Sequence, residues 1–352
     1  MELRQDRMRR GERLVAILKR QTIDRIPIIG MSRGFSALNV GHTLNDAYGE
    51  DVQKCLDAQI WTDEMYGWEG REQLSGAGRR MLSKEARMPT LEFDQALITT
   101  RYLVETEDEG WKLSLPSAKE VYAQAIEFGK LVLKRGTPYV SLNSFYTFTL
   151  AGRLCGPENL SRWMMKKPEL AHRLLRVATD FAIETAQLYV DTFGPERFVP
   201  YFGEPTTANQ IISPKHFEKF ALPYIKDYFE KIQAMGVKHS LVHVCGEQNL
   251  NLPYWAQVHM GDPAIISIGH EVDLDVASKY FPNDIIMGNT NTTVMVNGTP
   301  QQVYENCRIC IEKGRRHPGG FILAPGCELP PWAPPYNVWM MTKAVNDFGW
   351  YE

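Results

Sequence analysis

The sequence predicts an α/β fold, a closed (β/α)8 or TIM barrel. Short apolar runs rich in β-branched residues recur along the 352 residues, and a helical stretch follows most of them. Strands that alternate with helices are typical of a parallel sheet, and eight of each close into a barrel. Reactive polar residues end several runs, where barrel enzymes place their active sites. The predicted strands are residues 26–31, 58–63, 139–144, 198–203, 240–245, 264–269, 285–289 and 320–325.

Two of the predicted helices have start and stop signals, and one segment breaks the alternation. Helices are expected over 213–236 and 299–314, because Ser-Pro or Thr-Pro opens each and glycine ends it. Within residues 70–116, the runs 97–105 and 111–115 flank a polar turn. We predict a β-hairpin there, inserted after the second barrel strand. No linker or repeat divides the chain, so we expect a single domain over residues 1–352.

Composition narrows the class of protein. Hydrophobic residues make up 44% and charged residues 23%, as in ordinary globular proteins. The net charge of −3 gives no electrostatic footprint for nucleic acid. The sequence contains no run of 18 apolar residues, so it predicts no membrane span. The charged N-terminus lacks the apolar core of a signal peptide. Six cysteines are too few for a disulfide framework, so we expect a cytoplasmic protein.

Three residues predict a metal site. His243 and Cys245 end an apolar run, and residues two apart in a strand point to the same face. Cys327 follows the last predicted strand. Packing explains most single His or Cys residues in apolar runs, but one imidazole and two thiols at strand ends suit zinc. Three protein ligands leave a fourth position open, which is typical of a catalytic zinc.

Further polar residues at predicted strand ends are candidates for catalysis. Glu204 follows the fourth strand and is either a fourth metal ligand in the absence of substrate or a salt-bridge residue. His270 follows the sixth strand and either positions substrate or pairs structurally. Asn289 ends the seventh strand, and we assign it a catalytic role as well.

Aromatic residues also gather near the predicted strand ends. Flat side chains of this kind suit the walls of a pocket for a planar ligand, although packing in the core or the insertion is the alternative. The residues expected to contact substrate are Tyr66, Trp68, Phe145, Tyr146, Trp332 and Tyr336.

Several segments resemble the uroporphyrinogen decarboxylase superfamily, in its zinc-dependent, corrinoid-linked methyltransferase branch. The resemblance covers most of the chain and includes Glu204–Ala208, His243–Gly246 and Gly319–Pro331. The His-x-Cys…Cys pattern resembles the zinc motif of that branch, which the decarboxylases lack. The decarboxylases carry an arginine-rich motif after the first strand, where this chain has only Arg33. Porphyrinogen decarboxylation is therefore not expected.

The resemblance implies one of two methyl transfers, both with a corrinoid protein as partner. One kind of enzyme demethylates a donor such as a phenyl methyl ether onto cob(I)amide, and the aromatic residues favour this O-demethylase reading. The alternative is a methylcobamide:thiol methyltransferase of the coenzyme M type, in which zinc would hold the substrate thiol as a thiolate. A non-catalytic, zinc-stabilised binding protein is a third reading and would need a closed four-ligand site. The chain is expected to meet a small-molecule methyl donor and no nucleic acid or membrane, and a homo-oligomer is possible.

Overall fold

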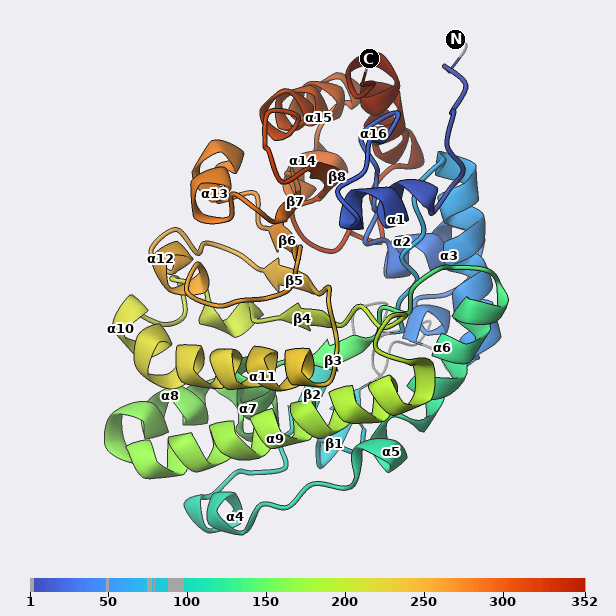
Figure 1. Cartoon of the computed structure of the whole chain (residues 1–352). Coiled ribbons are helices and arrows are strands. Elements are labelled where there is room, and N and C mark those ends of the chain that lie inside the picture. The colour runs from blue at the N-terminus through green and yellow to red at the C-terminus, as the bar shows by residue number, and fades with distance from the viewer. Residues whose placement is uncertain (1–2, 49–50, 75–77, 79, 88–97, 352) are drawn as a thin grey trace.

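A parallel sheet forms the centre of the molecule. The computed structural model describes residues 3–48, 51–74, 78, 80–87 and 98–351. Within these ranges six parallel strands stand in the order β3-β4-β5-β6-β7-β8, so each pairs with the next along the chain. In Figure 1 they occupy the middle and the helices lie around them. The strands are β3 (Asn143–Phe145), β4 (Tyr201–Gly203), β5 (Leu241–Val244), β6 (Ile265–Ile268), β7 (Ile285–Thr290) and β8 (Phe321–Pro325).

Two extended segments continue this sheet toward closure. Ile28 forms a parallel bridge with Leu323 of β8, which places the first predicted strand beside the last. The amide of Glu69 then donates to the carbonyl of Ile28 at 2.9 Å, so the segment after residue 67 runs beside the first strand. Arg71 in turn reaches Ser141, just before β3. The TIM-barrel-like α/β fold expected from the sequence is therefore confirmed.

The helices follow the strands as the alternation predicts. Both capped helices are present: Ser213 caps the segment before α11, and Thr299 caps α15 with a reciprocal bond to Gln302. No helix in the described ranges has the length and low polarity that crossing a bilayer requires. The helices are α1 (Glu12–Leu18), α2 (Arg33–Asn39), η1 (Asp46–Tyr48), α3 (Val52–Tyr66), α4 (Glu107–Lys112), α5 (Ala118–Val121), α6 (Ala123–Lys134), α7 (Phe148–Cys155), α8 (Pro157–Lys166), α9 (Pro168–Phe193), η2 (Pro205–Thr207), α10 (Pro214–His216), η3 (Phe217–Ala221), α11 (Leu222–Ala234), α12 (Leu252–Trp255), α13 (Leu274–Tyr280), α14 (Thr292–Asn297), α15 (Pro300–Gly314) and α16 (Pro335–Phe348).

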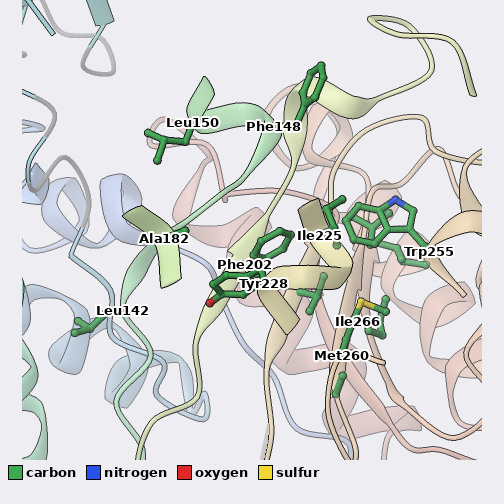
Figure 2. Close-up of a cluster of buried hydrophobic side chains, with 14 of the residues drawn as sticks. Leu142, Phe148, Leu150, Ala182, Phe202, Ile225, Tyr228, Trp255, Met260 and Ile266 are labelled. Carbon is green, nitrogen blue, oxygen red and sulfur yellow. The ribbon is translucent and has the colours of Figure 1, made fainter. Parts of the chain in front are cut away.

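The strands bury two faces against different partners. Val242 and Val244 belong to the large core between the sheet and the helices, whereas Leu241 belongs to a second core inside the barrel. Figure 2 shows part of the large core, where the ring of Phe202 from β4 stacks on Tyr228 of α11 at 5.0 Å. Because side chains alternate along a strand, His243 faces the barrel interior with Leu241.

One predicted strand is wrong. Residues 58–63 lie within the helix α3. Asp51 caps this helix by accepting from the amide of Lys54, and Gly67 ends it with φ of 68°. The apolar pattern does not mark this helix, because its buried face includes Gln59, Thr62 and Asp63 while Trp61 and Met65 are exposed. The extended segment after Gly67 takes the second place in the barrel instead.

The predicted hairpin, with arms 97–105 and 111–115, is wrong in its pairing, although the insertion does contain an antiparallel pair. An antiparallel pair joins β1 (Glu85–Arg87) and β2 (Ile98–Arg101), and residues 88–97 lie outside the described residues. The second predicted arm, 111–115, is not a strand, because α4 covers its start. Thr106 and Glu109 form a capping box that turns the polar segment into a helix, and this Thr-x-x-Glu signal was missed.

Candidate metal centre

The structure brings His243, Cys245 and Cys327 together. His243 lies on β5, Cys245 directly follows that strand, and Cys327 follows β8. One donor atom from each lies within 4.8 Å of the other two. Since β6 and β7 stand between β5 and β8, the three donors meet across the barrel interior and not along one sheet edge. They lie at the C-terminal ends of the strands, where barrel active sites are found.

The two sulfurs have the separation that a shared metal requires. Sγ of Cys245 lies 3.9 Å from Sγ of Cys327. A disulfide would need about 2.05 Å. Two thiolates on one tetrahedral zinc, each about 2.3 Å from the metal, stand about 3.8 Å apart. The distance therefore fits a metal-bridged pair better than a disulfide.

The imidazole of His243 is also positioned to bind a metal. The residue is 4% exposed, and its Nε2 is buried without a hydrogen-bond partner. Its Nδ1 lies 3.0 Å from Oγ of Ser267, which faces His243 in the register of β5 and β6. When Nδ1 donates to that hydroxyl, Nε2 keeps its lone pair for a metal. A buried nitrogen left without a partner costs free energy unless something binds it.

The thiols are electrostatically coupled. Because Cys327 accepts a hydrogen bond from the thiol of Cys245, its pKa falls below that of a free cysteine, and the pKa of Cys245 rises. One proton is thus shared between the two sulfurs. A divalent cation would replace that proton and hold both groups as thiolates. The donor set, the sulfur spacing and the free Nε2 together fit zinc.

Close backbone contacts hold the loops that carry these ligands. A Cβ on Gly326, the residue before Cys327, would lie 2.7 Å from the amide nitrogen of His270. A Cβ on Gly269 would lie 2.9 Å from the backbone of Gly246, which follows Cys245. Only glycine permits such approaches between the loops after β5, β6 and β8. These glycines bring the two cysteine loops near one another.

Glu204 lies beneath a helix rather than in the metal cluster. Its carboxylate is fully buried and accepts from the backbone amides of Thr147, Phe148 and Thr149 and from the hydroxyl of Thr147, at 2.5–3.0 Å. Burial raises the pKa of Glu204, and these bonds oppose the rise. Both oxygens serve the N-terminus of α7. A metal could take Glu204 only by breaking these bonds.

Asn289 and His270 form one structural unit. The amide of Asn289 donates to the carbonyls of Gly269 at 3.0 Å and Val272 at 2.7 Å, and so fixes the loop after β6. His270 stands on that loop, is exposed, and has Glu271 3.6 Å away. The contacts of Asn289 give it a role in shaping the loop, so direct catalysis by this side chain is not supported. A role for His270 stays a prediction.

The predicted aromatic wall is dispersed. Tyr66 and Trp68 stack on one another in the hydrophobic core, at 4% and 1% exposure, so the prediction that they contact substrate is corrected. Tyr336 is 61% exposed on α16 and lines an outer groove between α15 and α16, so it is corrected too. Trp332, in the loop after Cys327, is exposed and stays a prediction. The side chain of Phe145 lies outside the described residues.

Tyr146 lies next to the metal cluster. A Cβ on Gly203 would lie 3.4 Å from the ring of Tyr146 and 3.6 Å from Cβ of His243, so this glycine gives both side chains room. The guanidinium of Arg153 sits 4.3 Å from the ring centre of Tyr146. Tyr146 therefore remains a candidate for contact with substrate.

Comparison with known proteins shows the family of this chain. The profile of the family "Uroporphyrinogen decarboxylase (URO-D)" matches residues 100–348, which include all three candidate ligands. The chain belongs to the URO-D family. It is 30% identical over 169 residues to a methylated-thiol–coenzyme M methyltransferase of Methanosarcina mazei, and 25% over 209 residues to a methylcobamide:CoM methyltransferase of Methanosarcina acetivorans. The alignments cover 47% and 56% of this chain and 43% and 58% of those proteins, so the chain spans about half the length of these relatives.

A solved structure of a methyltransferase from Methanosarcina mazei has the same fold. It superposes with a TM-score of 0.78 and covers 96% of this chain and 98% of that one, at 19% sequence identity. The likeness is one of fold. It shows that this URO-D family chain shares the fold of that structure.

Three residues of this URO-D family member lie at or beside the candidate site and are not predicted from the sequence. Ser267 was a detectable polar residue in an otherwise apolar strand, Ile-Ile-Ser-Ile. Tyr201 lies inside the barrel, with its ring stacked on His243 at 6.3 Å between ring centres. The guanidinium of Arg71 lies 4.3 Å from the ring centre of Tyr201. Nothing in the sequence marks Arg71, because the predicted second strand, 58–63, ends before the extended segment that carries this residue.

Proposed function

We propose that this chain is a metal-dependent methyltransferase that transfers a methyl group between a small thiol and the corrinoid of a separate protein. The observation that carries the proposal is the convergence of His243, Cys245 and Cys327, with a free Nε2 and a sulfur spacing of 3.9 Å. Three protein donors leave room for a fourth from the substrate. The similarity to methylcobamide:CoM and methylated-thiol methyltransferases supports the same reaction class.

Bound zinc would supply Lewis acidity that keeps a substrate thiol in its thiolate form at neutral pH. The chain's own residues prepare the place for it. Ser267 fixes the ring of His243 so that Nε2 faces Cys245 and Cys327. The backbone contacts of Gly326 and Gly269 hold the cysteine loops in place. The substrate sulfur then has one place to bind, at the open end of the barrel.

A thiol substrate is favoured over an aryl methyl ether by the positions of the aromatic residues. Tyr66 and Trp68 are core residues, and Tyr336 lies on an outer groove. Three of the six aromatic residues predicted to contact substrate therefore lie elsewhere, and the argument for O-demethylation rested on these six. The similar proteins named above are described as acting on methylated thiols or coenzyme M, which agrees with the thiol reading.

The corrinoid would come on a partner protein. The sequence lacks the pattern Asp-x-His-x-x-Gly, with which corrinoid modules bind cobalt. A corrinoid is also too large for an ordinary pocket beside a substrate. We propose that the carrier docks transiently over the C-terminal face of the barrel, with a modest interface.

The test is an assay of purified, zinc-loaded chain with a methylated corrinoid carrier and 2-mercaptoethanesulfonate. We expect thiol-dependent demethylation of the corrinoid, followed by its absorption spectrum, and loss of this activity in Cys327→Ser. A parallel reaction offers cob(I)amide carrier with methoxybenzoates, methanol and methylamines. Turnover of a methoxybenzoate without any reaction of thiols would overturn the thiol proposal in favour of O-demethylation. Full activity of the serine variant would refute the metal mechanism.

A further inference from the structure

Gln248 is a fully buried amide three residues after the candidate ligand Cys245. Its Nε2 donates to the backbone carbonyl of Cys245 and to the hydroxyl of Thr207, at 3.1 Å in both cases. Its Oε1 accepts from Nδ2 of Asn251 at 2.8 Å and from the indole nitrogen of Trp255 at 3.3 Å. A glutamine amide offers two N–H donors and two acceptor lone pairs. All four are therefore used, in a side chain that is shielded from water.

The partners of Gln248 allow its amide only one orientation. An indole N–H donates and never accepts, so the atom that faces Trp255 must be Oε1. Nε2 then faces Cys245, whose carbonyl can only accept. A turned amide would leave these buried groups without partners, which costs free energy. The surroundings of Gln248 therefore impose its bond to Cys245.

This bond holds the peptide of Cys245 at the point where the sheet no longer does. The pairing of β5 with β4 ends at His243, and its pairing with β6 ends at Val244. Gly246 has a φ of 75°, so the chain turns away from the strand direction directly after Cys245. A tether on the carbonyl restrains the backbone dihedral ψ of Cys245, and with it the path of the loop that carries this thiol.

The other end of the tether is anchored in the loop after β4. The hydroxyl of Thr207 donates to the carbonyl of Glu204 at 2.7 Å, and Nδ2 of Asn251 donates to the carbonyl of Thr207 at 2.9 Å. The carboxylate of Glu204 in turn accepts from the backbone amides at the N-terminus of α7. Gln248 therefore ties Cys245 to a framework that follows β3 and β4 and has its own support.

We infer that Gln248 is a positioning residue of the metal centre, which holds the backbone of Cys245 so that its thiolate meets His243 and Cys327. The inference rests on the proposed function, because it takes these three residues as the metal ligands. Gln248 acts through the carbonyl of Cys245 and is not a ligand itself. Partners that orient a ligand in this way typically change metal affinity by about 10- to 100-fold.

The test measures metal binding and stability in the same variants. Gln248→Met keeps the length of the side chain and removes all four hydrogen bonds. We expect its zinc affinity, measured by competition with a chromophoric chelator, to fall about 10- to 100-fold. Cobalt reports the geometry, because Co²⁺ suits the same nitrogen and sulfur donors and its visible and thiolate charge-transfer bands change when a thiolate is displaced. We expect such a change in cobalt-loaded Gln248→Met.

Gln59→Met is the matched control for lost stability. Gln59 is 5% exposed, and its Nε2 donates to the carbonyls of Cys55 at 3.2 Å and Gln73 at 2.8 Å. Its Oε1 accepts from the amide of Gln73. Both methionine variants should unfold at a lower temperature than wild type, because each leaves buried polar groups without partners. Gln59→Met should nevertheless keep the wild-type zinc affinity and cobalt spectrum.

A milder variant keeps the test decisive if Gln248→Met does not fold. Gln248→Asn keeps an amide but is one methylene shorter, so the amide is drawn back from Cys245 and Trp255. It should lower zinc affinity and alter the cobalt spectrum, whereas Gln59→Asn should do neither. Wild-type affinity and spectrum in the Gln248 variants, together with a lowered melting temperature, would make Gln248 a structural residue and overturn the inference.

The two hypotheses fail separately, because metal uptake is measured without any methyl transfer. If Gln248→Met binds zinc more weakly than wild type but no thiol is methylated, the proposed function is wrong and the positioning role stands. If thiols are methylated and the Gln248 variants bind zinc as tightly as wild type, the positioning role is wrong and the function stands. A wild-type chain that takes up neither zinc nor cobalt would overturn both.

Discussion

At the scale of single residues, the metal-binding capacity should depend on three side chains and the fold on none of them. Cys245→Ser and Cys327→Ser each remove a thiolate, and we expect zinc affinity to fall by more than about 100-fold. Thermal unfolding should change little, because a barrel with cores on both sides of its sheet does not need a metal to fold. Metal analysis after dialysis against a chelator measures the loss. Full zinc occupancy in both variants would refute the assignment.

Ser267 should affect the zinc affinity of the site without binding the metal itself. Ser267→Ala removes the acceptor for Nδ1 of His243, so the ring loses its fixed orientation, and zinc affinity should fall about 10- to 100-fold. Competition with a chromophoric chelator measures this change. Ser278→Ala is a matched control, since Ser278 forms the same kind of contact with His317 at 2.7 Å, away from the three ligands. Equal zinc affinities in the two variants would remove the positioning role.

The sequence revealed the metal ligands but not the residues that support them. His243 and Cys245 were recognisable because a spacing of two in a strand fixes a shared face, and Cys327 because it followed another strand. Ser267 and Tyr201 act through neighbouring strands, and their register follows from barrel closure rather than from any local pattern. Glu204 could not be assigned from sequence, because a buried carboxylate can serve a metal or a helix terminus equally well.

At the scale of elements, the packing of α2 against the loop after β8 should control the position of Cys327. A Cβ on Gly34 would lie 2.7 Å from Cγ of Pro331, so Gly34→Ala must displace that loop. We expect a loss of about 1–3 kcal/mol in stability together with weaker zinc binding. Gly152→Ala in α7 is the control, since its Cβ would find no atom nearer than 3.7 Å and alanine favours a helix. Urea unfolding of both variants checks this, and equal stabilities would contradict it.

Element boundaries were predictable where caps and periodicity agreed. The segment 213–236 and α15 were found because a Ser-Pro or Thr-Pro start and a glycine stop bracket them. Helix α3 resembles a strand in sequence because residues 58–63 contain β-formers, and its buried face repeats at helical spacing but is partly polar. The error also displaced the second strand, and with it Arg71. One wrong element thus hid a residue of the candidate site.

At the scale of the whole molecule, the two chain ends meet at the start of the first barrel segment. Asp24 accepts the backbone amides of Arg7 and Met8 near the N-terminus, and its own carbonyl accepts the amide of Tyr351 near the C-terminus. Its carboxylate also binds the buried Arg13, with 2.6 Å to Nε and 2.8 Å to Nη2. This one acid therefore links α1, the barrel and both ends of the chain.

Asp24 should make the free energy of unfolding depend on pH in the acid range. Burial alone would raise the pKa of Asp24, but the bonds from Arg13 and from the amides of Met8 and Arg7 outweigh it and hold the pKa well below its ordinary value. A lowered carboxyl pKa stabilises the fold fully above the unfolded value of about 3.9, and this contribution is lost as pH falls further toward the folded value. We expect Asp24→Asn to cost about 2–3 kcal/mol at pH 7, since Arg13 keeps only Glu69 as a buried partner.

The difference between the two proteins should then shrink below about pH 4, as the wild-type carboxylate gains its proton. Urea unfolding over a pH series measures it. Asp108→Asn, which removes an exposed acid paired with Lys112 on α4, should change stability by less than about 0.5 kcal/mol at every pH. The difference in unfolding free energy between wild type and Asp24→Asn could instead stay constant down to the lowest pH measured. In that case the shape of the side chain, and not its charge, would join the two ends of the molecule.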